Sequence, residues 1–290
     1  MEGAGPIEGP LCVVGAGVMG GQIAHQAALY GVAVRLYSRS RERLDTTSEQ
    51  CAGLLRKRVD KGKLEAPDCE AALRRVATTT DLADAVSDAP IIIESVAEDR
   101  DAKRAILAAV GEAAGDDAVI GTNSSTLPSS LFADVVPNPG RLLNVHFMNP
   151  ALVMPLVEVV RGAHTGEATV AAAMGFARRI GKSPVLVERE SFGFVANRIL
   201  FIAMQEAFSL VESGDVSIED CDLAVRNGLG WPMGPFAIAD LVGLDVVEAI
   251  LAEGHRQTGE DRWAPPALLR DRVARGELGR KSGRGFTLPG

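Results

Sequence analysis

Short apolar runs alternate with amphipathic helical patterns along the first two thirds of the chain. Several of these runs are unbroken Val, Ile and Leu, which is typical of strands covered on both faces. The predicted strands span 11–15, 33–38, 89–96, 118–125, 142–147, 156–160 and 184–188. The predicted helices between them span 18–30, 40–58, 65–75, 100–114 and 166–180. This alternation predicts a doubly wound α/β domain with a mainly parallel sheet.

The segment from 40 to 75 differs from the rest of this pattern. Two helical stretches are joined there by DKGKLEAPD, residues 60–68, and no strand pattern lies between them. We expect an inserted helical hairpin that projects from the sheet, in place of a standard crossover. From the residues alone, a solvated helix face explains its basic charge better than a binding site does. The basic residues are Arg56, Lys57, Arg58, Lys61 and Lys63.

The pattern becomes entirely helical after residue 187. Helical patterns cover 191–214, 217–228, 234–259 and 264–278. Ser217 followed by Asp220 is typical of a capped helix start. We therefore predict two domains, 1–187 with the sheet and an all-helical domain over 188–290.

Composition excludes several classes of protein. The chain has 290 residues, 47% of them hydrophobic, a net charge of -8 and a pI of about 5.2. This acidic balance argues against nucleic-acid binding, which normally uses a basic surface. The apolar runs are too short to span a membrane, and the N-terminus does not have the pattern of a signal peptide. We therefore expect a cytoplasmic protein that binds neither nucleic acid nor membranes.

The cysteines do not indicate a metal site. Cys12, Cys51, Cys69 and Cys221 are scattered, with no Cys-x-x-Cys pair and no His at metal-ligand spacing. We expect reduced thiols and no bound metal.

A glycine-rich turn follows the first predicted strand. Gly15, Gly17 and Gly20 form a Gly-x-Gly-x-x-Gly motif, with Val18 and Met19 inside it, and a helix is predicted to begin there. In Rossmann-type domains such glycines allow a tight turn, close approach of a pyrophosphate and close packing of helix on strand. The helix N-terminus adds free N–H groups for phosphate oxygens. The motif predicts a dinucleotide site in a Rossmann-type domain.

The end of the second predicted strand indicates which dinucleotide binds. An NAD site usually has Asp or Glu there, bound to the ribose 2′-hydroxyl. This chain has Ser38, and Arg39 and Arg43 follow it. A hydroxyl with guanidinium groups favours a 2′-phosphate, which a carboxylate would repel. We predict an NAD(P) site at these residues with NADP(H) favoured over NAD(H). The alternative is that the arginines only solvate a helix start and NAD still binds.

Polar residues lie near the ends of three later predicted strands, within GTNSSTL (121–127), NVHFMNP (144–150) and MPLVEVV (154–160). Ligands of open α/β sheets bind at the carboxyl ends of the strands. A lone His among apolar residues is more often a core residue, and a lone Glu could face solvent at an edge. A buried carboxylate, however, needs a partner. We predict that Glu158 pairs with His146, orients the imidazole and stabilises it after it takes a proton.

Together these motifs resemble those of the 3-hydroxyacyl-CoA dehydrogenase family, of the short bacterial 3-hydroxybutyryl-CoA dehydrogenase type. The resemblance covers nearly all of 11–286, and the order and spacing of its motifs are far more specific than the glycine motif alone. The motifs are VGAGVMG, ESVAED (94–99), TNSSTL, HFMNP, LVEVV, GFVANR (193–198), WPMGPF (231–236), GLD (243–245) and GRKSGRGF (279–286). The resemblance implies hydride transfer between a nicotinamide cofactor and the β-carbon of a 3-hydroxyacyl or 3-oxoacyl thioester, in fatty acid metabolism.

The resemblance also implies roles for individual residues. His146 matches the catalytic base, Glu158 its orienting carboxylate, and Ser125 the hydroxyl that binds the reacting oxygen. Asn197 matches an assisting amide from the helical domain. The implied cofactor-binding residues, beyond the glycine motif, are Glu98, Lys103 and Asn123. The implied substrate-binding residues are Asn149 in the cleft and Lys61 and Lys63 on an arm over the CoA nucleotide.

The chain departs from the family at the second strand, where Ser38 replaces the usual Asp. This departure supports the preference for NADP(H), and with it reduction as the working direction. Three alternatives stay open: an enzyme acting on an acyl-carrier-protein thioester, an enzyme acting on a free hydroxy acid such as a sugar acid or carnitine, and a dinucleotide-binding protein without turnover. The family also implies a homodimer formed through the helical domain.

Overall fold

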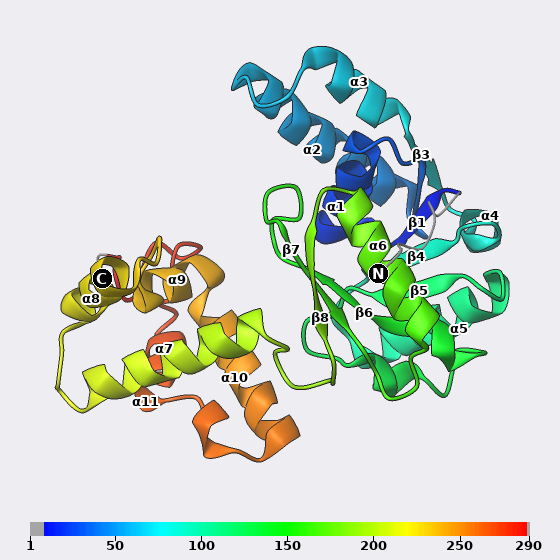
Figure 1. The fold of residues 1–290 in the computed structure, drawn as a ribbon. Coiled ribbons are helices and arrows are strands. Elements are labelled where there is room, and N and C mark those ends of the chain that lie inside the picture. The colour runs from blue at the N-terminus through cyan, green and yellow to red at the C-terminus, as the bar shows by residue number, and fades with distance from the viewer. Residues whose placement is uncertain (1–8, 289–290) are drawn as a thin grey trace. The chain divides into compact units, whose positions relative to one another are not determined.

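The computed structural model describes residues 9–288, in which one eight-stranded sheet precedes a helical unit (Figure 1). The strands are β1 (Leu11–Val14), β2 (Val34–Tyr37), β3 (Val76–Thr79), β4 (Ile91–Glu94), β5 (Val119–Thr122), β6 (Leu142–Phe147), β7 (Leu156–Val160) and β8 (Ser183–Val187). Their order is β3-β2-β1-β4-β5-β6-β7-β8, and only the β6–β7 pair is antiparallel among these described strands. The first six positions follow the order of a doubly wound Rossmann sheet. The predicted fold class is confirmed.

Helices cover both faces of the sheet because successive strand residues point to opposite sides. In β1, Leu11 and Val13 pack with helices α1 and α6, whereas Cys12 and Val14 pack with α4 and α5. This two-sided burial explains the unbroken apolar runs of the sequence. The helices of this part are α1 (Val18–Leu29), α2 (Arg41–Asp60), α3 (Ala66–Arg74), α4 (Leu82–Val86), α5 (Arg100–Ala113) and α6 (Glu167–Arg179).

The predicted helical hairpin is present as α2 and α3, which extend beyond the sheet (Figure 1). Its topological interpretation was wrong, because β3 follows directly and pairs in parallel with β2. The hairpin is therefore itself the crossover between these two strands. The sequence pattern missed β3 because VATT is short, half-exposed and at the sheet edge, so it has no apolar run to mark it.

The helical unit packs around an aromatic core. Phe208, Phe236 and Phe286 contact one another with ring centroids 5.0–5.5 Å apart, and Trp263 packs edge-on against Phe192. Its helices are α7 (Ala196–Glu212), α8 (Ile218–Leu229), α9 (Pro235–Val242), α10 (Leu244–Thr258) and α11 (Ala267–Ala274).

The helix start predicted at 217 is also confirmed. The Ser217 hydroxyl accepts a hydrogen bond from the Asp220 amide at 3.0 Å, which caps α8.

Backbone packing divides the chain after Ser191 into two compact units. The functional boundary placed after residue 187 stays a prediction, because compactness does not show what each unit binds. The homodimer also stays a prediction; several apolar side chains of the second unit are exposed, Ile199 and Leu229 most of all. Within residues 9–288, none of the helices is long and apolar enough to cross a membrane.

Candidate active site

The glycine turn after β1 has the geometry that a dinucleotide requires. Gly15 has a φ of +120°, and a Cβ there would lie 2.5 Å from the Ser95 carbonyl oxygen at the end of β4. A Cβ on Gly20 would lie 1.9 Å from the Gly15 oxygen, so α1 packs on the turn too closely for any side chain. A Cβ on Gly17 would meet nothing within 4 Å. That open space at the N-terminus of α1 leaves room for phosphate groups.

The turn also lies where the sheet order reverses. Strands β2 and β4 flank β1, and the strand order runs in opposite directions from β1 on its two sides. Ligands of open α/β sheets bind at the carboxyl ends of the strands at such a point. Val18 is exposed at the start of α1, whereas Met19 packs against the core. The residues of this turn therefore fit a bound dinucleotide.

At the end of β2, the polar groups are partly engaged in capping α2. The Ser38 hydroxyl accepts from the Ser40 amide at 3.3 Å, and the Ser40 hydroxyl accepts from the Arg43 amide at 3.2 Å. Arg41 donates to the Thr78 hydroxyl at 3.0 Å. The side chains of Arg39 and Arg43 are exposed. The exposure leaves both guanidinium groups accessible to a phosphate.

His146 and Glu158 face each other across the antiparallel β6–β7 pair. They are directly opposed in register, and the distance from His146 Nδ1 to Glu158 Oε2 is 2.9 Å. Opposed residues of an antiparallel pair share one face of the sheet, which is why the two side chains meet. His146 is 5% exposed and Glu158 is 0% exposed. The carboxylate must accept the Nδ1 proton, so Nε2 is the nitrogen that is left to exchange a proton.

The loop after β5 contains Ser125 and is held from two sides. Asn123 accepts from the Phe147 amide at 2.8 Å and donates to the Ser95 hydroxyl at 3.3 Å. Asn144, buried in β6, donates to the Ser124 and Leu127 carbonyl oxygens at 3.3 and 3.1 Å. These amides connect the loop to β4 and β6. Ser125 is half-buried, and its hydroxyl has no hydrogen-bond partner among residues 9–288.

Glu98 binds the same loop through one carboxylate oxygen. That oxygen accepts from the Ser124 hydroxyl at 2.5 Å, the Ser125 amide at 3.0 Å, and the amide and hydroxyl of Thr126 at 3.0 and 2.9 Å. The other oxygen lies 3.4 Å from Lys103 Nζ. Burial acts to raise the pKa of Glu98, but the Lys103 charge and the bonds from Ser124 and Thr126 together hold that pKa below its ordinary 4.5. Glu98 is therefore ionised at neutral pH.

Four further buried residues support this loop and were not predicted from the sequence, namely Glu94, Thr122, Ser124 and Asn144. Glu94 had a usable signal, because a carboxylate at the end of the apolar run IIIE needs a partner for the same reason as Glu158. Its main partner is Lys103, which is itself buried in α5. Lys103, predicted near the nicotinamide ribose, therefore lies beneath the loop with its ammonium between two carboxylates.

The remaining predicted residues lie just after β6, at the turn of the α2–α3 hairpin and in the second unit. Asn149 is exposed just after β6. Lys61 and Lys63 are exposed on either side of Gly62, at the turn of the α2–α3 hairpin. Asn197 lies in the first turn of α7, within the second unit.

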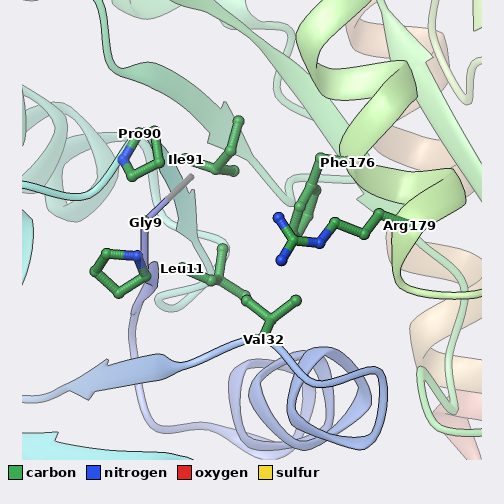
Figure 2. A pocket seen from close by; sticks show the side chains of 8 residues that line it. Gly9, Leu11, Val32, Pro90, Ile91, Phe176 and Arg179 are labelled. Carbon is green, nitrogen blue, oxygen red and sulfur yellow. The ribbon is translucent and has the colours of Figure 1, made fainter. Parts of the chain in front are cut away.

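Two cavities in the sheet-containing unit involve none of the predicted site residues. One, of about 10 Å³, lies at the amino ends of β1 and β4, where Arg179 reaches toward Leu11, Ile91 and Phe176 (Figure 2). The other, of about 360 Å³, lies between α1, α2 and α3. The first cavity lies at the amino ends of the strands, whereas the candidate site lies at their carboxyl ends. No group of three or more metal-ligating side chains occurs within the described residues.

Comparison with known proteins agrees with the motifs. Residues 10–191 match the 3-hydroxyacyl-CoA dehydrogenase NAD binding domain, and residues 193–288 match the 3-hydroxyacyl-CoA dehydrogenase C-terminal domain. A 3-hydroxybutyryl-CoA dehydrogenase of Mycobacterium tuberculosis is 38% identical over 275 residues, which cover 94% of this chain and 96% of that protein.

Solved structures are similar over the same length. The (S)-3-hydroxybutyryl-CoA dehydrogenase of Ralstonia eutropha superposes with a TM-score of 0.92 at 34% identity, covering 97% of this chain and 99% of that one. A diketoreductase that acts on dicarbonyl compounds superposes with a TM-score of 0.85 at 31% identity, covering 100% of both chains. By its matching domains, its relatives and its fold, this chain belongs to the 3-hydroxyacyl-CoA dehydrogenase family.

Proposed function

We propose that this protein transfers hydride between a nicotinamide cofactor and the β-carbon of a 3-hydroxyacyl or 3-oxoacyl thioester. The observation that carries the proposal is the buried His146–Glu158 pair, 2.9 Å apart, in a sheet whose first turn fits a dinucleotide. The names of the relatives favour 3-hydroxybutyryl-CoA and acetoacetyl-CoA as the substrate pair.

His146 exchanges the substrate proton in this proposal. The bound nicotinamide supplies the hydride acceptor in oxidation and the hydride donor in reduction. In oxidation, His146 Nε2 takes the proton of the β-hydroxyl group; in reduction, the imidazolium returns it to the carbonyl oxygen. Glu158 fixes the tautomer through Nδ1 and stabilises the imidazolium charge. A base positioned in this way contributes about 10²–10⁴-fold in rate.

Ser125 and Asn197 donate hydrogen bonds to the reacting oxygen. The Ser125 amide is already bound to Glu98, so its hydroxyl is the group that would reach the substrate. Asn197 contributes its side-chain amide from the second unit. Asn149 adds a polar group near the acyl end, and Lys61 and Lys63 supply positive charge to the CoA phosphates.

The dinucleotide binds at the glycine turn. Gly15, Gly17 and Gly20 let its pyrophosphate approach the N-terminus of α1, with Val18 and Met19 in the first turn. Glu98 and Asn123 lie toward the nicotinamide ribose, and Lys103 acts through Glu98. For the adenine ribose, Ser38 with the exposed Arg39 and Arg43 favours NADP(H) over NAD(H).

The direct test is a spectrophotometric assay of acetoacetyl-CoA with NADPH and NADH side by side. Turnover with either cofactor supports the proposal. The same assay with a carrier-bound thioester, free hydroxy acids and a simple diketone identifies the substrate class. Cofactor binding without oxidation of NADPH or NADH by any of these compounds would contradict the proposed reaction.

Replacing Ser38 with Asp is expected to move the cofactor preference toward NADH. A carboxylate at the end of β2 binds the 2′-hydroxyl of NADH but repels the 2′-phosphate of NADPH. The ratio of kcat/KM for NADPH to that for NADH should fall by about tenfold or more. Ser183→Asp, the same change at the exposed start of β8, is the control and should leave this ratio unchanged. An unchanged ratio in Ser38→Asp would discard the preference for NADP(H).

A further inference from the structure

The carboxylate of Glu94 is completely buried and fully hydrogen-bonded. Its Oε1 accepts from the Val96 amide at 2.6 Å and from Lys103 Nζ at 2.9 Å. Its Oε2 accepts from the Thr122 hydroxyl at 2.6 Å and again from Lys103 Nζ at 3.0 Å. Thr122 reaches Glu94 because the two residues are register partners at the ends of β5 and β4. Four donor contacts leave this carboxylate little freedom to move.

Lys103 connects this buried carboxylate to a second one. Its ammonium lies 2.9 Å from Glu94 and 3.4 Å from Glu98, and its side chain is only 1% exposed. Glu98 Oε2 faces Lys103, while Glu98 Oε1 accepts four hydrogen bonds from residues 124–126. A chain of contacts therefore runs from Glu94 through Lys103 and Glu98 to the backbone of Ser125.

Burying two charges seldom stabilises a fold more than apolar residues of the same size would. Here the buried pair ends on residues 124–126, which lie outside any helix or strand and are otherwise held by the Asn144 amide and by Glu98. One carboxylate oxygen of Glu98 is held by a buried ammonium, and that ammonium is bound to Glu94. The arrangement holds the loop in one place rather than only adding to stability.

We propose that Glu94 is a positioning residue of the active site, which acts through Lys103 and Glu98 to hold the Ser125 loop where its hydroxyl can bind the reacting oxygen. This inference rests on the function proposed above. Glu94 touches neither substrate nor cofactor in this proposal. Its contribution to the reaction is the placement of other groups, to which catalysis is sensitive on the scale of about 1 Å.

Thr122→Val is a mild probe of this role. It removes one of the two donors to Glu94 Oε2 with little change of shape or charge, whereas Glu94→Gln alone would take the nearer of its two carboxylates from the buried Lys103. The matched control is Thr169→Val in α6, where another buried threonine hydroxyl donates to the Gly140 carbonyl oxygen at 2.8 Å. Both variants lose a buried hydroxyl donor, and the melting temperature of Thr122→Val should fall further because its bond is to a charged group.

We expect Thr122→Val to lower kcat by about 3- to 10-fold, since a bond to a charged group is lost. Thr169→Val should keep kcat within about twofold, because surface and core changes outside the site act mainly on stability. Thr122→Ser, which restores the hydroxyl, should recover most of the activity. Equal kcat values for the two valine variants would overturn the proposal.

The Thr122 hydroxyl also accepts a hydrogen bond from the Ser124 amide at 3.4 Å. A second experiment must therefore show that the loss of kcat in Thr122→Val comes from the bond to Glu94. For this purpose, Thr122→Val is combined with Glu94→Gln and Lys103→Met, which together remove both members of the buried pair. Glu98 loses its ammonium partner as well, but it is partly exposed and keeps its bonds from residues 124–126. If Glu94 positions the loop, this double variant has low kcat, and adding Thr122→Val lowers it no further. A double variant with wild-type kcat, or a further loss of 3- to 10-fold on adding Thr122→Val, would contradict the proposal.

The dissociation constants of NADPH and NADH, measured by fluorescence titration of the same variants, give a readout that does not need turnover. Glu98 lies toward the nicotinamide ribose in the proposed function, so Thr122→Val should weaken cofactor binding more than Thr169→Val does. If the wild-type protein has no thioester activity, the proposed reaction fails, and equal cofactor affinities of the two variants would then reject the positioning role separately.

Discussion

Replacing His146 with Ala is expected to lower kcat by about 10²–10⁴-fold while the protein still binds its cofactor. In the proposed reaction the imidazole exchanges the substrate proton, and its removal leaves Glu158 with no base to orient. The measurements are kcat with acetoacetyl-CoA and the dissociation constant of NADPH or NADH.

The alanine variant leaves the Glu158 carboxylate, which is 0% exposed, without its imidazole partner, and this can destabilise the fold. His146→Gln avoids that problem, because its amide can still donate to Glu158 but cannot act as a base at neutral pH. It should be as inactive as the alanine variant and melt closer to the wild type. His255→Ala, in α10 of the second unit, is the control of the same residue type and should keep full activity. Wild-type kcat in both His146 variants would remove the acid–base assignment.

Replacing Gly20 with Ala is expected to abolish cofactor binding and to destabilise the sheet-containing unit. The new Cβ would lie 1.9 Å from the backbone oxygen of Gly15, and a backbone atom cannot move aside as a flexible side chain can. Either α1 shifts away from β1 or the turn changes shape, and such overpacking costs about 1–3 kcal/mol or more. Thermal melting and cofactor titration measure the two effects.

Gly17→Ala separates cofactor binding from folding at the same turn. Its Cβ would meet no protein atom within 4 Å, so the melting temperature should stay near that of the wild type. The methyl group would occupy the space through which a pyrophosphate approaches, and cofactor affinity should fall by about tenfold or more. The matched control is Gly175→Ala in α6, which is equally uncrowded; it should stabilise the helix slightly and leave affinity unchanged. Wild-type affinity in Gly17→Ala would mean that phosphates do not pass over this residue.

The contact between His146 and Glu158 could be predicted from the sequence, but its geometry could not. The residue types and their apolar surroundings were enough to predict that Glu158 needs a partner and that His146 is that partner. Their meeting depends on the antiparallel register of β6 and β7. A slip of one residue in either strand would have turned one side chain to the other face of the sheet. No local pattern in the chain specifies that register, because it is set by packing on both sides.

The contact between Glu94 and Lys103 beneath the Ser125 loop could not be predicted from the sequence. Glu94 and Lys103 are nine residues apart and belong to a strand and a helix, so no periodicity connects them. On a sequence, Lys103 is an ordinary helix lysine that would be expected in solvent. It becomes buried because α5 packs on the same face of the sheet that receives Cys12 and Val14. The Glu94–Lys103–Glu98 contacts therefore depend on the position of α5 in the tertiary structure.

Local chemistry determined the parallel sheet, the glycine turn, the switch to an all-helical second part and the cap at Ser217, because each depends on side-chain period or on backbone conformation within a few residues. The tertiary structure decided the edge strand β3, the use of the α2–α3 hairpin as a crossover, and the contacts Glu158–His146 and Glu94–Lys103. These features join segments that are distant in the chain, and their free energy comes from burial and pairing between elements rather than within them.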